Sequence, residues 1–185
     1  MTTPILLSIE GNIGAGKSTP LKIILGLIRP RSGDLFLNGK NYKTLKQTDI
    51  FGKFGYMTQT PILFNRSILD NILFSNPNSS RKQVEELLQE FGLDTVFNKL
   101  DKGIDTMVGK NGSKLSGGQK QVVWFLRIYL HDPEILLFDE PTASLSTKSK
   151  ETLMKLINKG FAKKTIIMAS HDDFLIKMAT RKVRM

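Results

Sequence analysis

One short stretch near the start of the chain limits its fold more than any other feature. Residues 11–18, GNIGAGKS, fit the pattern G-x-x-x-x-G-K-[ST], whose glycine-rich turn lets backbone N–H groups point at phosphate groups. The apolar run PILLSI precedes it at residues 4–9, and apolar residues at helical spacing follow it at 21–28. A strand before and a helix after this pattern is the context in which it forms a phosphate-binding loop. The stretch therefore predicts an α/β domain that binds a phosphorylated ligand.

The charged and polar residues at the end of this loop have defined tasks. Lys17 would reach the β- and γ-phosphates, and the hydroxyl of Ser18 would ligate Mg²⁺. The N-terminus of the following helix adds partial positive charge. Pro20 falls in the first turn of that helix, where a missing N–H costs least, but it disfavours helical geometry at Thr19. We therefore expect a usable but slightly distorted phosphate site.

Bulk composition excludes several classes of protein. The chain has no Cys, which rules out disulfides and thiolate metal sites, and no apolar run reaches the roughly 18–20 residues that span a bilayer. The first residues lack the positive region of a signal peptide. The net charge of +10 favours anionic partners, and nucleic acid stays open but is not favoured, since no aromatic-interleaved basic stripe is visible. We expect a cytoplasmic location, peripheral to the cytoplasmic side of a membrane if a membrane partner exists.

Strand and helix patterns alternate at both ends of the chain and give way to helices in the middle. Strands are expected at 34–37, 53–59, 134–140 and 165–170, and helices at 21–28, 81–93, 121–130 and 148–160, the last capped by Gly160. Asn38-Gly39 predicts a tight turn after the second strand. The alternation predicts a mainly parallel sheet covered by helices, an α/β P-loop NTPase fold with a RecA-like core. We expect that core at residues 1–58 and 129–185, with a helical subdomain inserted at 59–128.

Two carboxylates end the apolar strand ILLFDE. A buried strand can deliver Asp139 and Glu140 to the carboxyl edge of a parallel sheet, where ligands bind in such folds. Asp139 could hold Mg²⁺ through water, and Glu140 could orient or deprotonate a water that attacks a γ-phosphate. The pair therefore predicts hydrolysis of a nucleoside triphosphate.

The stretch LSGGQ at residues 115–119 narrows the assignment. Together with the loop, Gln59 in GYMTQTPILF, ILLFDE and His171, it resembles the ATP-binding-cassette (ABC) ATPases, and the parts match that family in order from Gly11 to His171. In the family these parts are Walker A, the Q-loop, the signature, Walker B and the switch histidine. VGKNGSKLSGGQ and ILFNRSILDNILF look more like the exporter branch than the importer branch.

The resemblance implies an ATPase that works as a head-to-tail dimer, with ATP lying on the loop of one subunit and under LSGGQ of a second nucleotide-binding subunit. Glu140 would act as base, supported by His171 and Lys17, and Ser18, Gln59 and Asp139 would serve the Mg²⁺. A separate transmembrane transporter subunit would be the partner that the ATPase energises. The residues implied to contact ATP are Gly11, Asn12, Gly14, Ala15, Gly16, Lys17, Ser18, Thr19, Gln59, Ser116, Gly117, Gly118 and Gln119.

The chain departs from the family pattern in several places. Only ten residues precede Gly11, so the sequence predicts a core truncated at the N-terminus, without the upstream strands and the adenine-stacking aromatic residue. It also stops soon after His171, which predicts that the usual closing strands are absent. Ser146 stands where the family usually has Asp, and Met107 stands where exporters tend to have Glu before the signature. These departures put the cooperation of two ATP sites and the coupling to a membrane partner in question.

Three other functions remain open at this point. The opening PILLSIEGNIGAGKST is very similar to that of the deoxynucleoside kinases, although this resemblance covers only about 15 residues. A soluble ABC protein that acts on nucleic acid or ribosomes is a second alternative, and steeply salt-dependent binding would favour it. A nucleotide-binding cassette with impaired hydrolysis is the third.

Overall fold

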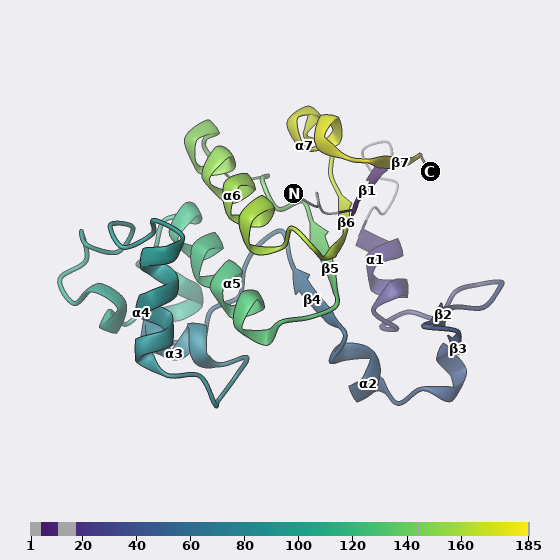
Figure 1. Cartoon of the computed structure of the whole chain (residues 1–185), viewed down its shortest axis with the longest axis horizontal. Coiled ribbons are helices and arrows are strands. Elements are labelled where there is room, and N and C mark those ends of the chain that lie inside the picture. The colour runs from purple at the N-terminus through teal and green to yellow at the C-terminus, as the bar shows by residue number, and fades with distance from the viewer. Residues whose placement is uncertain (1–4, 11–17, 144, 185) are drawn as a thin grey trace. The chain divides into compact units, whose positions relative to one another are not determined.

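The computed structural model describes residues 5–10, 18–143 and 145–184, with only the backbone described at residues 5–10, 174 and 184. The chain divides into two compact units (Figure 1). The first comprises residues 1–59, 133–143 and 163–185, and the second comprises 60–132 and 144–162. The loop residues 11–17 lie outside the described residues.

A five-stranded sheet forms the centre of the first unit. Its strands follow the order β4-β5-β6-β1-β7, and every pair of neighbours is parallel. The strands are β1 (Ile5–Glu10), β4 (Phe54–Met57), β5 (Ile135–Asp139), β6 (Thr165–Ala169) and β7 (Arg181–Arg184). Since β5 and β6 are adjacent, their carboxyl ends meet at the same edge of the sheet. The predicted α/β fold with a parallel sheet is confirmed.

Helix α1 (Ser18–Ile24) packs against this sheet through Leu21, which is fully buried beside Leu137 and Ala169. The helix forms with Pro20 in its first turn, as expected for the position where proline costs least. It ends earlier than the predicted 21–28, because Gly26 adopts a left-handed φ of 71°. Helix α7 (Asp173–Met178) follows β6.

A short hairpin and two small helical segments complete the first unit. Strands β2 (Phe36–Leu37) and β3 (Lys40–Asn41) pair antiparallel around Asn38 and Gly39. Both turn residues have positive φ, 49° and 77°, which is the geometry that Asn-Gly predicts. The 3₁₀ segment Tyr42–Thr44 and helix α2 (Gln47–Phe51) lead to β4.

The second unit is helical and has an aromatic core. Its helices are α3 (Ile68–Leu73), α4 (Arg81–Glu90), α5 (Gly117–His131) and α6 (Thr147–Gly160), with short 3₁₀ turns at Gly103–Asp105 and Lys110–Gly112. Phe125 of α5 is fully buried, and its ring centroid lies 5.2 Å from that of Phe91 and 5.1 Å from that of Phe161. No helix in the described part of the chain combines the length and apolarity that a bilayer crossing needs.

The structure differs from the sequence-based expectations at three further points. Strand β7 follows His171 and pairs with β1, so the expectation that closing strands are absent was wrong. Gly160 lies inside α6 with Phe161 as its C-cap, and a Cβ at Gly160 would come within 2.8 Å of the Phe125 ring. Close packing therefore explains this glycine better than helix termination. Residues 129–132 and 144–162, which were expected in the core, belong to the second unit, and Gln59, which was expected in the helical subdomain, belongs to the first.

Candidate functional site

The end of β5 carries the acid pair that the sequence singles out. Asp139 is the last residue of the strand and is only 7% exposed. Glu140 follows with a φ of 47°, a left-handed conformation that is uncommon for a residue with a side chain. Such backbone outliers concentrate at active sites and ligand clamps, so this geometry itself suggests a functional position.

Glu140 is held by the segment that follows the neighbouring strand β6. Its Oε1 lies 2.8 Å from Nδ1 of His171, and its Oε2 accepts a hydrogen bond of 3.2 Å from the hydroxyl of Ser170. The pairing of Asp139 with Ala169 explains this contact, because the next residue on each strand is then brought side by side. The structure thus brings together two of the predicted catalytic residues, Glu140 and His171, from positions 31 residues apart.

Sequence reasoning missed a small hydrogen-bond network behind this pair. The buried hydroxyl of Ser170 also accepts a bond of 3.1 Å from the backbone N–H of Asp172. The carboxylate of Asp172 in turn accepts a hydrogen bond of 2.8 Å from the hydroxyl of Thr142, which lies in the loop after Glu140. These hydrogen bonds connect the segment after β5 to the segment after β6. Predicting them from the sequence would have required knowing that the two strands are neighbours.

Asp139 has a partner that the sequence did not indicate. The hydroxyl of Tyr56 on β4 donates to Oδ2 of Asp139 at 3.2 Å, while Oδ1 is buried and has no hydrogen-bond partner among the described residues. Burial, and secondarily the charge of Asp139 and this bond, raise the pKa of Tyr56 to about 12, so the phenol keeps its proton at neutral pH. An orphaned buried carboxylate oxygen fits a position that faces a cation or its bound water.

Part of the predicted site falls outside what the structure describes. This holds for Gly11, Asn12, Gly14, Ala15, Gly16 and Lys17. Ser18 and Thr19 open helix α1, which places the Ser18 hydroxyl at a helix N-terminus. Gln59 lies two residues after β4 and is exposed, and it belongs to the same unit as the acid pair.

The LSGGQ residues begin helix α5 in the second unit. Ser116 is the N-cap: its hydroxyl accepts from the backbone N–H of Gln119, and the Gln119 side chain accepts from the N–H of Ser116. The side-chain amide nitrogen of Gln119 also donates a hydrogen bond of 3.0 Å to the backbone carbonyl of Val96. These bonds hold the cap, while the N–H groups of Gly117 and Gly118, in the first turn, have no intrahelical acceptor. The stretch is therefore a preformed helix N-terminus suited to an anion.

A basic cavity of about 440 Å³ adjoins this helix start. Lys99 and Lys148 line it together with Ser116 and Gly118, all within the second unit. The described acidic residues do not contribute to its lining. Its charge therefore matches a phosphorylated ligand.

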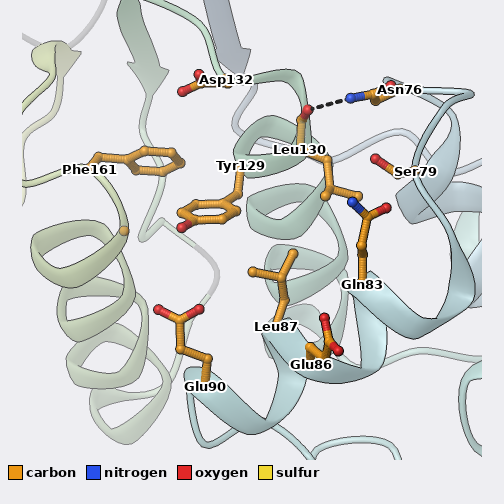
Figure 2. Close-up of a pocket in the computed structure, with 11 residues that line it drawn as sticks. Asn76, Ser79, Gln83, Glu86, Leu87, Glu90, Tyr129, Leu130, Asp132 and Phe161 are labelled. Atoms are coloured by element: carbon orange, nitrogen blue, oxygen red, sulfur yellow. Dashed lines mark hydrogen bonds between the residues drawn. The ribbon is translucent and has the colours of Figure 1, made fainter.

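Another cavity of the second unit, about 520 Å³ in volume, has a different character (Figure 2). Figure 2 shows the rings of Tyr129 and Phe161 at one end of it, with Leu87 and the carboxylates of Glu86 and Glu90 along α4. Among the described residues, those that the sequence predicts to be functional do not line it. This hollow is thus distinct from the acid pair and from LSGGQ.

Ser146, the residue that departs from the family pattern, has a structural task as the N-cap of α6. Its hydroxyl accepts from the backbone N–H of Ser149 at 3.3 Å. We expect Ser146→Ala to cost about 1 kcal/mol of unfolding free energy, and Ser146→Asp to cost far less because Asp is an equally good N-cap. Urea unfolding of both variants measures this difference. Equal stability of the Ala and Asp variants would contradict the cap.

Comparison with known proteins gives consistent results. The family model described as ABC transporter matches residues 5–143. P-glycoprotein 14 of Caenorhabditis elegans is 33% identical over 177 residues, which cover 96% of this chain and 13% of that protein. A Rickettsia typhi protein, whose name describes an export ATP-binding/permease protein, is 35% identical over 173 residues, covering 94% of this chain and 30% of its own length.

The solved structures include a similar fold. A bacterial Atm1-family ABC exporter with ATP bound superposes with a TM-score of 0.89 at 29% identity, over 99% of this chain and 32% of that one. This chain thus spans less than a third of the length of each of these relatives.

Proposed function

Because this chain belongs to the ABC transporter family, as an ATP-binding domain of the exporter type, we propose that it binds Mg-ATP and hydrolyses it to energise a transmembrane partner. The single observation that supports hydrolysis most strongly is the contact of 2.8 Å between Glu140 and His171. In this contact the Glu140 carboxylate, which can accept a proton, is hydrogen-bonded to the His171 imidazole. The family resemblance implies that this imidazole contacts the γ-phosphate.

In the proposed reaction Glu140 orients the attacking water and takes its proton. The carboxylate has about four lone-pair positions, so a water can still bind beside the bonds from His171 and Ser170. The bond from Ser170 and the Glu140 backbone N–H, which donates to the Ala169 carbonyl at 2.8 Å, keep the base in place before the reaction. His171 is 63% exposed at its side chain and is free to contact the γ-phosphate and steady the developing charge.

The residues fit a magnesium ion that arrives with the nucleotide. The described residues contain no cluster of three or more carboxylate, imidazole or thiol side chains, so a cation bound here takes most of its ligands from phosphate and water. Oδ1 of Asp139 is the buried acceptor available to such a water, and the hydroxyl of Ser18 would be a direct ligand. Gln59 would face the same ion. The bound Mg²⁺ would neutralise charge on the β- and γ-phosphates.

A second copy of this chain would complete the site. LSGGQ begins a helix whose N-terminal N–H groups suit an anion, and Lys99 and Lys148 line the cavity beside it. We therefore assign Ser116, Gly117, Gly118 and Gln119 to the ATP held by the loop of the partner copy, in a head-to-tail dimer.

A transmembrane partner is proposed from the relatives and from an exposed apolar surface. The Rickettsia typhi relative includes a permease in its name, and this chain covers only 30% of it. In the second unit the side chains of Ile62, Phe74 and Met107 are 61%, 52% and 48% exposed. The backbone of Met107 bridges that of Ser67, so the segment before LSGGQ lies beside the segment that carries Ile62 and Phe74. The proposed partner would cover this surface, on the cytoplasmic side of the membrane.

The direct test is release of phosphate from ATP by the purified chain. We expect ADP and phosphate with Mg²⁺ present and none when EDTA removes it. Binding of ATP without release of phosphate would instead support the cassette with impaired hydrolysis. Transfer of the γ-phosphate to a deoxynucleoside would support the kinase alternative, for which the family match over residues 5–143 offers no support.

A further inference from the structure

We propose that Tyr56 is a positioning residue for the metal site: its hydroxyl fixes the orientation of the Asp139 carboxylate, so that Oδ1 faces the magnesium ion and its water. This inference rests on the proposed function. Tyr56 lies three residues before Gln59 in the stretch GYMTQTPILF, and none of the predicted site residues is Tyr56.

The register of the sheet explains why these two side chains meet. Tyr56 on β4 pairs with Leu137 on β5, and Asp139 stands two residues further along the same strand. Since side chains on a strand alternate between faces, Asp139 points to the same face as Leu137 and lies diagonally across from Tyr56. A diagonal neighbour is within reach of a long aromatic side chain, and the hydroxyl of Tyr56 reaches Oδ2 at 3.2 Å.

The position of the Tyr56 hydroxyl is well defined by packing. The ring is half-buried and packs against the buried cluster that includes Phe54 and Leu137. A hydroxyl on such a ring has little freedom to move away from Asp139. The packed ring therefore holds its hydroxyl in place, and the hydrogen bond from this hydroxyl restricts the orientation of the Asp139 carboxylate.

The Asp139 carboxylate needs such a restraint. Rotation about the bond to a carboxylate group is soft, so burial alone does not decide where each oxygen points. Oδ2 is the oxygen bonded to Tyr56, and Oδ1 is buried without a hydrogen-bond partner among the described residues. The bond thus separates the two oxygens into one that is anchored and one that is available.

Residues that orient metal-binding groups typically change metal affinity by about 10- to 100-fold when they are replaced. The bond here is 3.2 Å long and neutral on the donor side, which favours the lower end of that range. We expect Tyr56→Phe to lower the affinity for the metal ion by roughly tenfold. A substitution that disrupted the fold would instead lower the nucleotide affinity and the thermal stability together.

The experiment measures Mn²⁺, used in place of Mg²⁺, by electron paramagnetic resonance on the full chain with the β,γ-imido analogue of ATP. For Tyr56→Phe we expect roughly tenfold weaker Mn²⁺ binding. Affinity for the analogue in EDTA and the thermal midpoint should match the wild type. Turnover should need about tenfold more Mg²⁺ but reach the wild-type rate when Mg²⁺ is saturating.

Two further variants control for other causes. Tyr42→Phe removes another phenol donor of the same unit, which bonds the carbonyl of Ile24 at 2.8 Å, and it should leave Mn²⁺ affinity unchanged. In an Asp139→Asn background, Tyr56→Phe should have no additional effect on Mn²⁺, because the oriented carboxylate is already gone.

The outcomes separate this inference from the function on which it rests. If the wild type binds Mn²⁺ with the analogue and Tyr56→Phe binds it equally well, the positioning role is overturned. An equal loss in Tyr42→Phe would also overturn it. If the wild type binds neither the analogue nor Mn²⁺, the proposed function itself fails.

Discussion

Replacing Glu140 by Gln is expected to lower the rate of ATP hydrolysis by roughly 10²- to 10⁴-fold, the range that a positioned general base contributes. The amide keeps the size of the side chain and can still accept a hydrogen bond from Ser170, but it cannot take the proton of the attacking water. Binding of Mg-ATP should persist, because Asp139 and the loop are unchanged. A dimer that closes on ATP and reopens after hydrolysis should then accumulate.

The measurement combines steady-state phosphate release with sedimentation of the protein in Mg-ATP. Glu134→Gln is a matched control, since Glu134 directly precedes the same strand but is exposed and pairs with Lys53. It should hydrolyse ATP at the wild-type rate. A Glu140→Gln variant that turns over as fast as the wild type would show that the base has been assigned to the wrong residue.

Replacing Asn71 by Ala is expected to destabilise the second unit by about 4 kcal/mol, since each buried group left unsatisfied costs about 1–3 kcal/mol. The fully buried Asn71 side chain makes four hydrogen bonds. Its Oδ1 accepts from the N–H of Phe64 at 2.9 Å and from Arg127 at 2.8 Å. Its Nδ2 donates to the carbonyls of Phe64 and Ser67 at 3.0 and 2.9 Å.

The largest part of this cost comes from Arg127, a charged side chain that is only 7% exposed. Burial lowers its pKa to about 10, and no ion pair with a carboxylate is found for it in the described part of the chain. Its charge is instead stabilised by Asn71, by backbone carbonyls of Asn71 and Ile62, and by the ring of Trp124 at 4.6 Å. Without the Asn71 amide, the cation loses one of these partners.

The chain offers a direct optical probe of this cluster. Trp124 is its single tryptophan and lies under the Arg127 guanidinium, so its fluorescence during urea unfolding reports on this region. Asn65→Ala is the matched control, because Asn65 is exposed in the same segment and should change stability by less than about 0.5 kcal/mol. A loss below about 1 kcal/mol for Asn71→Ala would contradict the importance assigned to these bonds.

The sequence predicted the strands of the site well, because their signals are local. An apolar run that ends in Asp139 and Glu140, and another that ends before His171, are visible without a structure. Sequence spacing does not show that β5 and β6 are neighbours. The contact between Glu140 and His171 therefore follows from the order of the strands in the sheet and not from the local sequence pattern.

The features that were missed all depend on packing between distant residues. Tyr56 reads in the sequence as an ordinary strand residue, and only the register of β4 against β5 brings it to Asp139. Gly160 looks like a helix stop, yet the nearby Phe125 ring explains it. Strand β7 has a basic, weakly apolar sequence, and its pairing with β1 identifies it. Local propensity is a weak guide where tertiary partners decide.

Two copies of this chain are proposed to hydrolyse ATP together, and the dependence of the rate on protein concentration tests this proposal. Phosphate release per chain is followed at saturating Mg-ATP while the protein concentration is raised over about two orders of magnitude. If each ATP site is formed by two chains, the rate per chain should rise with protein concentration and then reach a plateau when nearly all chains are in dimers. No release is expected in EDTA or with Glu140→Gln. Release that stays at background at every concentration would show that the chain does not hydrolyse ATP, and a rate per chain independent of concentration would show that hydrolysis does not require two copies.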